Sequence, residues 1–256
     1  MFQNLFMNES YVIVYVLILI RVTSYLLSSS IFNSSQIPAP LKILFSLIIS
    51  LVAFEAYKNT SVPLDSLIII LAAKEVFLGV CLGMLTRFFF YALNMASELT
   101  SQALGLGSAS VYNPLSGINS SLIEQFQGTL AILIFFAVQG HHLVVSAVFQ
   151  SFELVSISQM TLKFNGLGEF VRWCQMLFEI ALKVAAPIVS SLFLVNLGMG
   201  ILGRAVPQIN VFVTSFQVTI MVGFLILFVS MPLYINEVVH ILDLTQSQMN
   251  KLMGSF

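Results

Sequence analysis

Long apolar runs follow one another along the whole chain, separated by short stretches that are rich in polar residues, glycine or proline. Several of these runs exceed the ~20 apolar residues that a helix needs to cross a bilayer. The pattern predicts an all-α, membrane-associated protein with about six long, partly broken helical regions. We place these regions near residues 10–32, 38–57, 64–98, 120–155, 168–204 and 210–243.

The predicted regions form a single helical unit over residues 1–256. No polar domain or low-complexity tail divides them, and we find no internal repeat. Pro187 and Pro232 lie inside apolar runs. Because proline removes a backbone donor and crowds the preceding turn, we expect each to kink its helix.

The segment Glu98–Asn119 interrupts the apolar pattern near the middle of the chain. Gly105, Gly107 and Gly117 loosen its backbone, and Pro114 disfavours a regular helix. Irregular backbone at membrane depth is tolerated only inside protein or against a water-filled cavity. The segment is therefore either an internal loop of that kind or an ordinary surface connection between two helices.

Three charged residues, Arg21, Glu75 and Lys183, lie within apolar regions. A charge at the bilayer centre costs about 2.5–3.5 kcal/mol on insertion scales, so these side chains should face protein or water. We expect them to be buried against neighbouring helices or chains. The alternative, charges that mark helix ends and extend toward the interface, suits Lys42 and Arg204 better.

Glu75, Gly79, Gly83 and Arg87 recur every four residues and share one helix face. Two glycines at this spacing permit close approach of another helix backbone. The pattern indicates helix packing and carries no sign of chemistry.

Composition supports the membrane assignment and excludes several other classes. The chain is 58% hydrophobic and only 8% charged, against about 25% charged residues in soluble domains. Its formal net charge of -1 and the lack of a basic cluster argue against nucleic-acid binding. Cys81 and Cys174 lie in apolar segments, which favours buried thiols over a disulfide or a zinc site. The N-terminal stretch has no basic residues before its apolar run, which argues against a cleaved signal peptide.

Motifs for catalysis or for a bound cofactor are missing from the sequence. There is no phosphate-binding glycine loop, no serine nucleophile elbow and no His-Glu-x-x-His motif. His141 and His142 are adjacent, so on a helix they point about 100° apart and do not form an i,i+4 metal pair. The sequence therefore predicts neither an enzyme nor a cofactor or metal site.

Three stretches in order carry a family resemblance. They are GLGSASVYNPLSGIN at Gly105–Asn119, the Gln-Gly-His-His of residues 139–142, and GMGILGRAVPQINVFVTSFQ at Gly198–Gln217. With the early Pro-x-Pro-x-Lys of Pro38–Lys42, they resemble the FliR/SctT family of type III export gate subunits along nearly the whole chain. This chain departs from the family where Ser108 replaces a frequent aromatic residue and Asn113 a frequent aspartate.

The resemblance implies a core structural and gating subunit of the type III protein export gate. FliP-like and FliQ-like subunits would complete a channel for unfolded flagellar proteins, with FlhB-like and FlhA-like membrane proteins as further partners. The implied location is the bacterial inner membrane, at the flagellar basal body. About residues 1–165 would form a FliP-like portion, and about residues 168–243 a FliQ-like helical hairpin.

The resemblance also implies roles for two segments. Residues 105–118 would be a plug loop in the channel lumen, with Gly105, Gly107, Ser108, Val111, Tyr112, Asn113, Pro114, Leu115 and Gly117 as its candidate residues. The turn between the fifth and sixth regions would be a hairpin tip at the cytoplasmic entrance, formed by Arg204, Pro207, Gln208 and Asn210.

A secondary transporter for a small solute is the competing function. Transporters also use broken helices and charges within the membrane, but they usually contain inverted repeats. Within the export-gate interpretation, the sequence leaves both flagellar and virulence secretion open.

Overall fold

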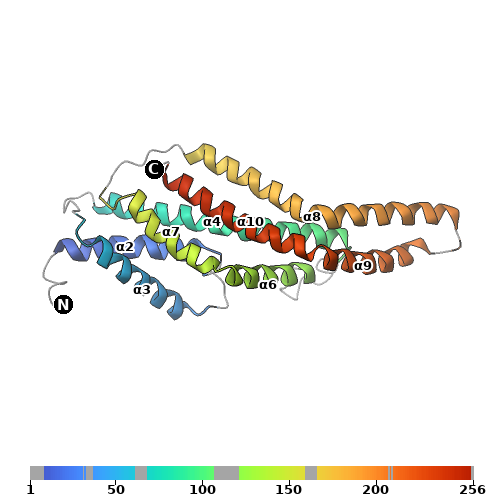
Figure 1. Cartoon of the computed structure of the whole chain (residues 1–256), viewed down its shortest axis with the longest axis horizontal. Helices are drawn as coiled ribbons and strands as arrows, with labels where there is room; N and C mark the ends of the chain where they lie inside the picture. Colours follow the sequence, from blue (N-terminus) through green and yellow to red (C-terminus); the bar gives the residue numbers. More distant parts are fainter. Residues whose placement is uncertain are drawn as a thin grey trace. The chain divides into compact units, whose positions relative to one another are not determined.

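The computed structural model describes residues 9–30, 32, 37–60, 68–106, 121–158, 166–206, 208 and 210–254, and all the regular structure in these ranges is helical (Figure 1). The helices are α2 (Glu9–Ser28), α3 (Ala39–Tyr57), α4 (Ile68–Ala103), α6 (Leu122–Ala137), α7 (Gly140–Leu154), α8 (Gly166–Ala205), α9 (Val211–Val229) and α10 (Met231–Gly254).

Among the described residues, five stretches are long and apolar enough to cross a membrane, and α6 with α7 makes a sixth if the pair is counted as one broken span. The five are Ser10–Ser28, Ala39–Tyr57, Ile68–Ala103, Val171–Ala205 and Val211–Val229. The predicted class, an all-α membrane protein, is confirmed.

Two of the regions predicted as continuous helices are each divided into two helices, so these predictions were wrong. The region 120–155 is divided at Val138 and Gln139, and the region 210–243 is divided at Ser230 and extends to Gly254. Pro232 is the second residue of α10 and does not kink a helix interior. Proline is tolerated there because the first N–H groups of a helix have no helical acceptor.

The third region also continues further than predicted, because α4 extends to Ala103. Residues 98–103, assigned above to the irregular segment, are helical. The side-chain amide of Gln102 donates to the carboxylate of Glu98 at 3.0 Å, an i,i+4 pair that stabilises this last turn.

Contacts divide the chain into two compact units, each built from segments that are far apart in sequence. Unit 1 comprises Met1–Phe88, His141–Arg172 and Leu244–Phe256, and unit 2 comprises Phe89–Gly140 and Trp173–Asp243. The predicted division into a FliP-like portion and a FliQ-like hairpin follows chain order instead, and it stays a prediction.

In unit 1, α2 packs tightly against the glycine face of α4. A Cβ placed on Gly79 would lie 2.6 Å from the carbonyl oxygen of Arg21, and one on Gly83 would lie 2.7 Å from that of Tyr25. Since these obstacles are backbone atoms, only glycine allows the two helices to approach so closely. The predicted packing role of the two glycines is confirmed.

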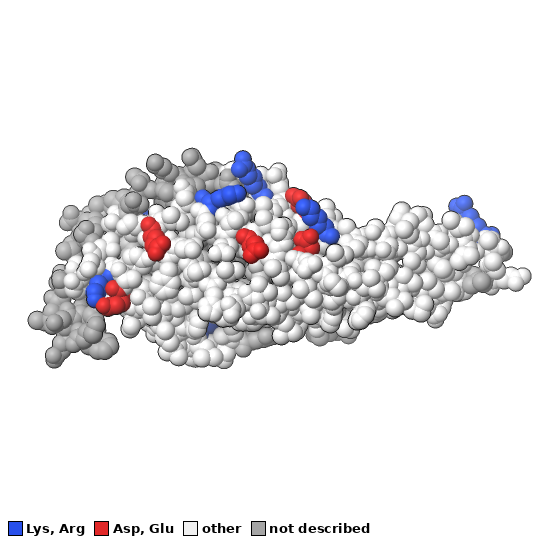
Figure 2. All heavy atoms as spheres, in the orientation of Figure 1, with Lys and Arg blue, Asp and Glu red and all other residues white. Residues whose placement is uncertain are grey.

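In unit 2, α8 and α9 form an antiparallel hairpin. Pairs of residues mark its register: Gly203 lies against Val211, the Thr219 hydroxyl donates to the Asn196 side-chain oxygen at 3.0 Å, and Leu192 lies against Gly223. The sum of the two residue numbers stays at 414 or 415 along the hairpin, as expected for helices that run in opposite directions. On the face visible in Figure 2, the outer part of this hairpin carries no charge except at its tip.

Candidate functional site

A closed cluster of charged side chains occupies the interior of unit 1. Arg21 of α2 donates from Nη2 to the Glu75 carboxylate of α4 at 2.9 Å, and its Nε donates to the other carboxylate oxygen. The relative exposure of Arg21 is 1% and that of Glu75 is 0%. The two residues therefore form a bidentate pair shielded from water, the geometry in which an arginine–carboxylate interaction is strongest.

Both cations of the cluster also bind the end of α7. Arg21 donates to the carbonyl oxygens of Ser151 at 2.8 Å and Val155 at 3.1 Å. Lys74 donates to those of Ser156 at 2.9 Å and Ile157 at 3.1 Å. The Ser151 carbonyl also accepts the Val155 N–H at 3.1 Å, so Arg21 adds a second donor there. The C-terminal end of a helix carries partial negative charge, which the two cations complement.

The charges of this cluster are compensated from two sides. Lys74 Nζ lies 3.1 Å from a Glu75 oxygen, so one carboxylate serves two cations. The carbonyls at the end of α7 provide the remaining negative potential, and the Phe152 ring centroid lies 4.2 Å from Arg21 Cζ. With every cation hydrogen-bonded and water excluded, the arrangement joins α2, α4 and α7 and leaves no group exposed for acid–base work.

Sequence reasoning selected Arg21 and Glu75 but missed Lys74 as a third member. Its position next to Glu75, within the second turn of an apolar helix, was the available signal. Lys183 differs from the other selected charges, because its side chain is 61% exposed within this chain and pairs with Glu179 at 2.7 Å. Burial of Lys183 against a neighbouring chain stays a prediction.

The segment predicted to be a plug loop begins at a well-defined helix end. Gly105 has φ +78°, its N–H donates to the Gln102 carbonyl at 3.0 Å, and the Leu106 N–H donates to the Ser101 carbonyl at 3.1 Å. These two bonds form a Schellman motif, which favours glycine at the left-handed position. Gly105 thus ends α4, a more specific role than general backbone flexibility.

The other end of the segment is fixed by a capping box. The Ser121 hydroxyl accepts from the Glu124 N–H at 3.1 Å, and the Glu124 carboxylate accepts from the Ser121 N–H at 3.3 Å. This Ser-x-x-Glu spacing is a helix-start signal in the sequence, and it marks the N-terminus of α6 more sharply than the apolar pattern does.

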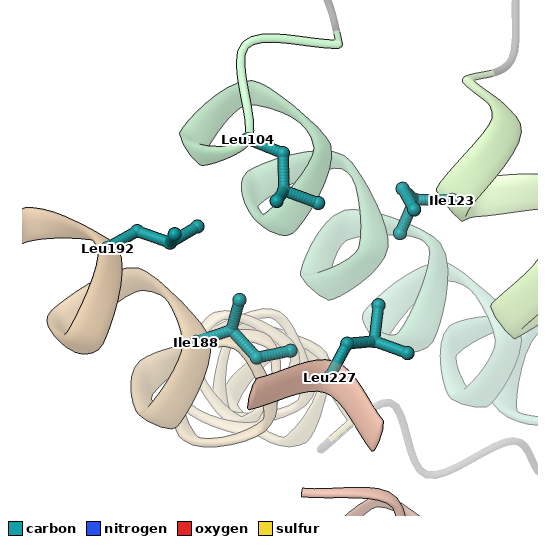
Figure 3. Close-up of a cluster of buried hydrophobic side chains, with 5 residues drawn as sticks. All are labelled: Leu104, Ile123, Ile188, Leu192 and Leu227. Carbon is teal, nitrogen blue, oxygen red and sulfur yellow. The ribbon is translucent and has the colours of Figure 1, made fainter. Parts of the chain in front are cut away.

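Both ends of the segment are held in one hydrophobic cluster (Figure 3). Leu104 and Ile123 are buried together with three side chains of the α8–α9 hairpin, Ile188, Leu192 and Leu227. The last described residues before the segment and the first ones after it therefore lie close together in unit 2. Most of the candidate plug residues lie outside the described part of the chain: Gly107, Ser108, Val111, Tyr112, Asn113, Pro114, Leu115 and Gly117.

The Gly-His-His stretch follows the break between α6 and α7. Gln139 is in the left-handed region at φ 59°, and its N–H donates to the Phe136 carbonyl at 3.1 Å. A Cβ on Gly140 would collide with the ring of Phe135. The Phe135 ring therefore leaves no room for a side chain at position 140. Among the described residues, no group of three His, Cys, Asp or Glu side chains could hold a metal ion.

The predicted hairpin tip is described at three of its four residues. Arg204 lies in the last turn of α8, where a cation suits the negative helix end. Asn210 is the N-cap of α9, with its side-chain oxygen 3.5 Å from the Val213 N–H. Gln208 lies in the turn, and Pro207 falls outside the described residues.

Comparison with known proteins identifies the family. Residues 12–245 match the family described as "Bacterial export proteins, family 1". The chain is 32% identical over 244 residues to the "Flagellar biosynthetic protein FliR" of Bacillus subtilis, covering 94% of each chain. It is 27% identical over 216 residues to the protein of the same description from Escherichia coli K12, covering 84% of this chain and 83% of the relative. The chain therefore belongs to bacterial export proteins family 1, the family of the flagellar biosynthetic FliR proteins.

Proposed function

We propose that this protein is a core structural and gating subunit of the flagellar type III export gate. It would join FliP-like and FliQ-like subunits in the bacterial inner membrane, at the flagellar basal body. FlhB-like and FlhA-like proteins would be its further partners, and unfolded flagellar proteins would pass through the assembled channel. The flagellar names of its relatives favour flagellar over virulence secretion.

One observation carries the gating role. Leu104 and Ile123 hold both ends of the 105–118 segment in one buried cluster with the α8–α9 hairpin. A loop with fixed ends can project as a unit into a channel and can move without unfolding the helices that support it. At membrane depth, such a segment would lie inside protein or against a water-filled lumen, and a gating role corresponds to the second of these.

The role is structural rather than catalytic. The buried ionisable cluster is saturated by internal hydrogen bonds of Arg21 and Lys74. Many large apolar side chains of α3, α8 and α9 are exposed in the single chain, including Ile43, Leu194, Ile201, Phe212 and Phe228. We propose that lipid and partner subunits cover these side chains in the assembly.

Co-expression tests this function. The tagged full-length chain is produced with or without FliP-like and FliQ-like subunits, and the purified material is examined by native mass spectrometry. A gate subunit should be recovered in a defined complex and be poorly stable alone. A well-behaved monomer that ignores both partners and moves a small solute in liposomes would favour the transporter alternative.

A further inference from the structure

One amide side chain, that of Asn196, lies at the edge of the contact between α8 and α9 in unit 2. Its side-chain oxygen accepts a hydrogen bond from the Thr219 hydroxyl at 3.0 Å. Thr219 is only 6% exposed, whereas Asn196 is exposed. Because the amide is planar and its oxygen is held at α9, its nitrogen points away from Thr219. The two N–H donors of this nitrogen therefore face outward from the hairpin.

The surface around this amide is apolar and is exposed in the single chain. Phe193, one turn before Asn196, is 61% exposed, and Leu197, next to Asn196, is 50% exposed. From Val184 to Gly203, α8 contains no charged residue. An extended apolar surface of this kind is typical of contact with another molecule. Whatever covers Phe193 and Leu197 therefore also removes the Asn196 amide from water.

An amide nitrogen that loses its water needs an acceptor, because an unpaired buried donor is costly. Within the described residues, Asn196 has no hydrogen-bond partner besides Thr219. Hydrocarbon supplies no acceptor. A carboxylate would bring a buried charge, and α8 has no cation on this stretch to compensate it. A neutral acceptor on a protein, a carbonyl or a hydroxyl, matches this surface best.

A helix can supply such an acceptor without losing its own hydrogen bonds. The Ser151 carbonyl of α7 shows this within the same chain, because it accepts both the Val155 N–H at 3.1 Å and an Arg21 N–H at 2.8 Å. A carbonyl oxygen has two lone pairs, so a side chain from a neighbouring helix can use the second one. An apolar helix that packs on the hairpin therefore has acceptors at every turn.

We propose that Asn196 is a binding residue of the hairpin surface and donates a hydrogen bond to a neutral acceptor on an apolar helix of a partner subunit. Thr219 is its positioning residue, because the hydroxyl holds the amide with its N–H groups outward. This inference rests on the proposed function, which provides the partner subunits. It adds the residue by which this surface distinguishes a protein helix from lipid hydrocarbon.

Competition for limiting partners tests the inference. Wild-type and variant full-length chains with different tags are produced together, with FliP-like and FliQ-like subunits in short supply, and intact-mass analysis gives their ratio in the purified complex. Asn196→Leu should enter the complex about fivefold less than the wild type, because one hydrogen bond across the contact is lost. Since Asn196 is exposed in the single chain, folding is at little risk.

Thr219→Val is the matched control, because it removes the hydrogen bond between the two helices and keeps the N–H donors of Asn196. In thermal unfolding of the full chain without partners, Asn196→Leu and Thr219→Val should behave alike, since each loses that bond. In the competition, Thr219→Val should lose clearly less than Asn196→Leu. Only a partner outside the chain accounts for a difference that appears in the complex alone.

Three results would overturn the inference. They are equal incorporation of Asn196→Leu and the wild type, a loss no larger than that of Thr219→Val, and a benzophenone side chain at Phe193 that crosslinks lipid or its own chain instead of another subunit. A wild-type chain that forms no complex would contradict the proposed function and this inference together. A complex that forms equally well with both variants would contradict this inference alone.

Discussion

Arg21 and Glu75 are separated by 54 residues in sequence and form a bidentate ion pair in the interior of unit 1. The pair is shielded from water, and Arg21 reaches from it to the last carbonyls of α7. Loss of either partner would leave a charge without compensation in a region of low polarity. Such a loss usually costs about 3–5 kcal/mol, whereas removal of both partners costs much less.

We therefore expect Arg21→Met and Glu75→Gln each to lower the thermal stability of the purified protein strongly, and the double variant to recover part of the loss. Thermal unfolding in detergent measures the effect. Lys183→Met is the control, because Lys183 is exposed and should tolerate the change. Additive losses in the double variant would contradict the coupling between Arg21 and Glu75.

The glycine face of α4 provides a second prediction. Gly83→Ala would place a methyl group 2.7 Å from the Tyr25 carbonyl oxygen, which cannot move without shifting α2. We expect a loss of about 1–3 kcal/mol, the usual range for overpacking. Gly200→Ala is the matched control, since no atom lies within 4 Å of the added carbon and alanine favours a helix. Equal thermal midpoints of the two variants would contradict the close contact.

Gly105 gives a prediction about backbone conformation. Because its φ is +78°, a β-branched residue is strained there, while asparagine tolerates the left-handed region better. Gly105→Val should lower stability by about 1–2 kcal/mol and slow export, and Gly105→Asn should have a milder effect. Thermal unfolding and secretion of a flagellar subunit measure the two outcomes. If both variants behave alike, the Schellman motif does not determine the residue at this position.

Deletion of Ser110–Gly117 tests the proposed plug. The deletion leaves Leu104 and Ile123, which anchor the segment, in place. Assembly should therefore survive, while cells that contain the whole gate should leak ions and small solutes, because bulky apolar residues no longer close the pore. Leu122→Ser, which changes an exposed residue beside the segment, should not leak. Loss of assembly without leakage would identify the segment as a structural linker.

The hairpin turn gives a prediction about partners. Gln208 lies in the described turn between Arg204 and Asn210. If this tip faces the cytoplasmic entrance, Gln208→Cys should crosslink to a cysteine in an FlhB-like partner, and Ser190→Cys on exposed α8 should not. Access to Gln208→Cys only from the periplasmic side would rule out the proposed orientation.

The sequence predicted the helical class and the glycine packing of α4 because both depend on local periodicity. It also identified Arg21 and Glu75 as unusual, but it could not pair them, since their contact depends on how distant helices meet. The partners of Arg21 at Ser151 and Val155 are backbone carbonyls. Because every residue has a carbonyl, the residue types do not reveal them. Likewise, the break between α6 and α7 depends on the left-handed backbone conformation of Gln139. Glutamine rarely adopts this conformation, so the residue type did not indicate a break there.

The interleaved construction of the two units has a consequence for biosynthesis. Unit 1 begins before unit 2 in the sequence but includes Leu244–Phe256, which follows the end of unit 2 at Asp243, so unit 1 cannot be completed before unit 2 has been synthesised. Arg21 emerges from the ribosome 54 residues before Glu75 and 130 residues before Ser151. At about 5–20 residues per second, this arginine waits several seconds for its first partner. A nascent chain stalled before Glu75 therefore carries an uncompensated arginine within an apolar helix, and we expect it to be degraded faster than a chain stalled after Ser151.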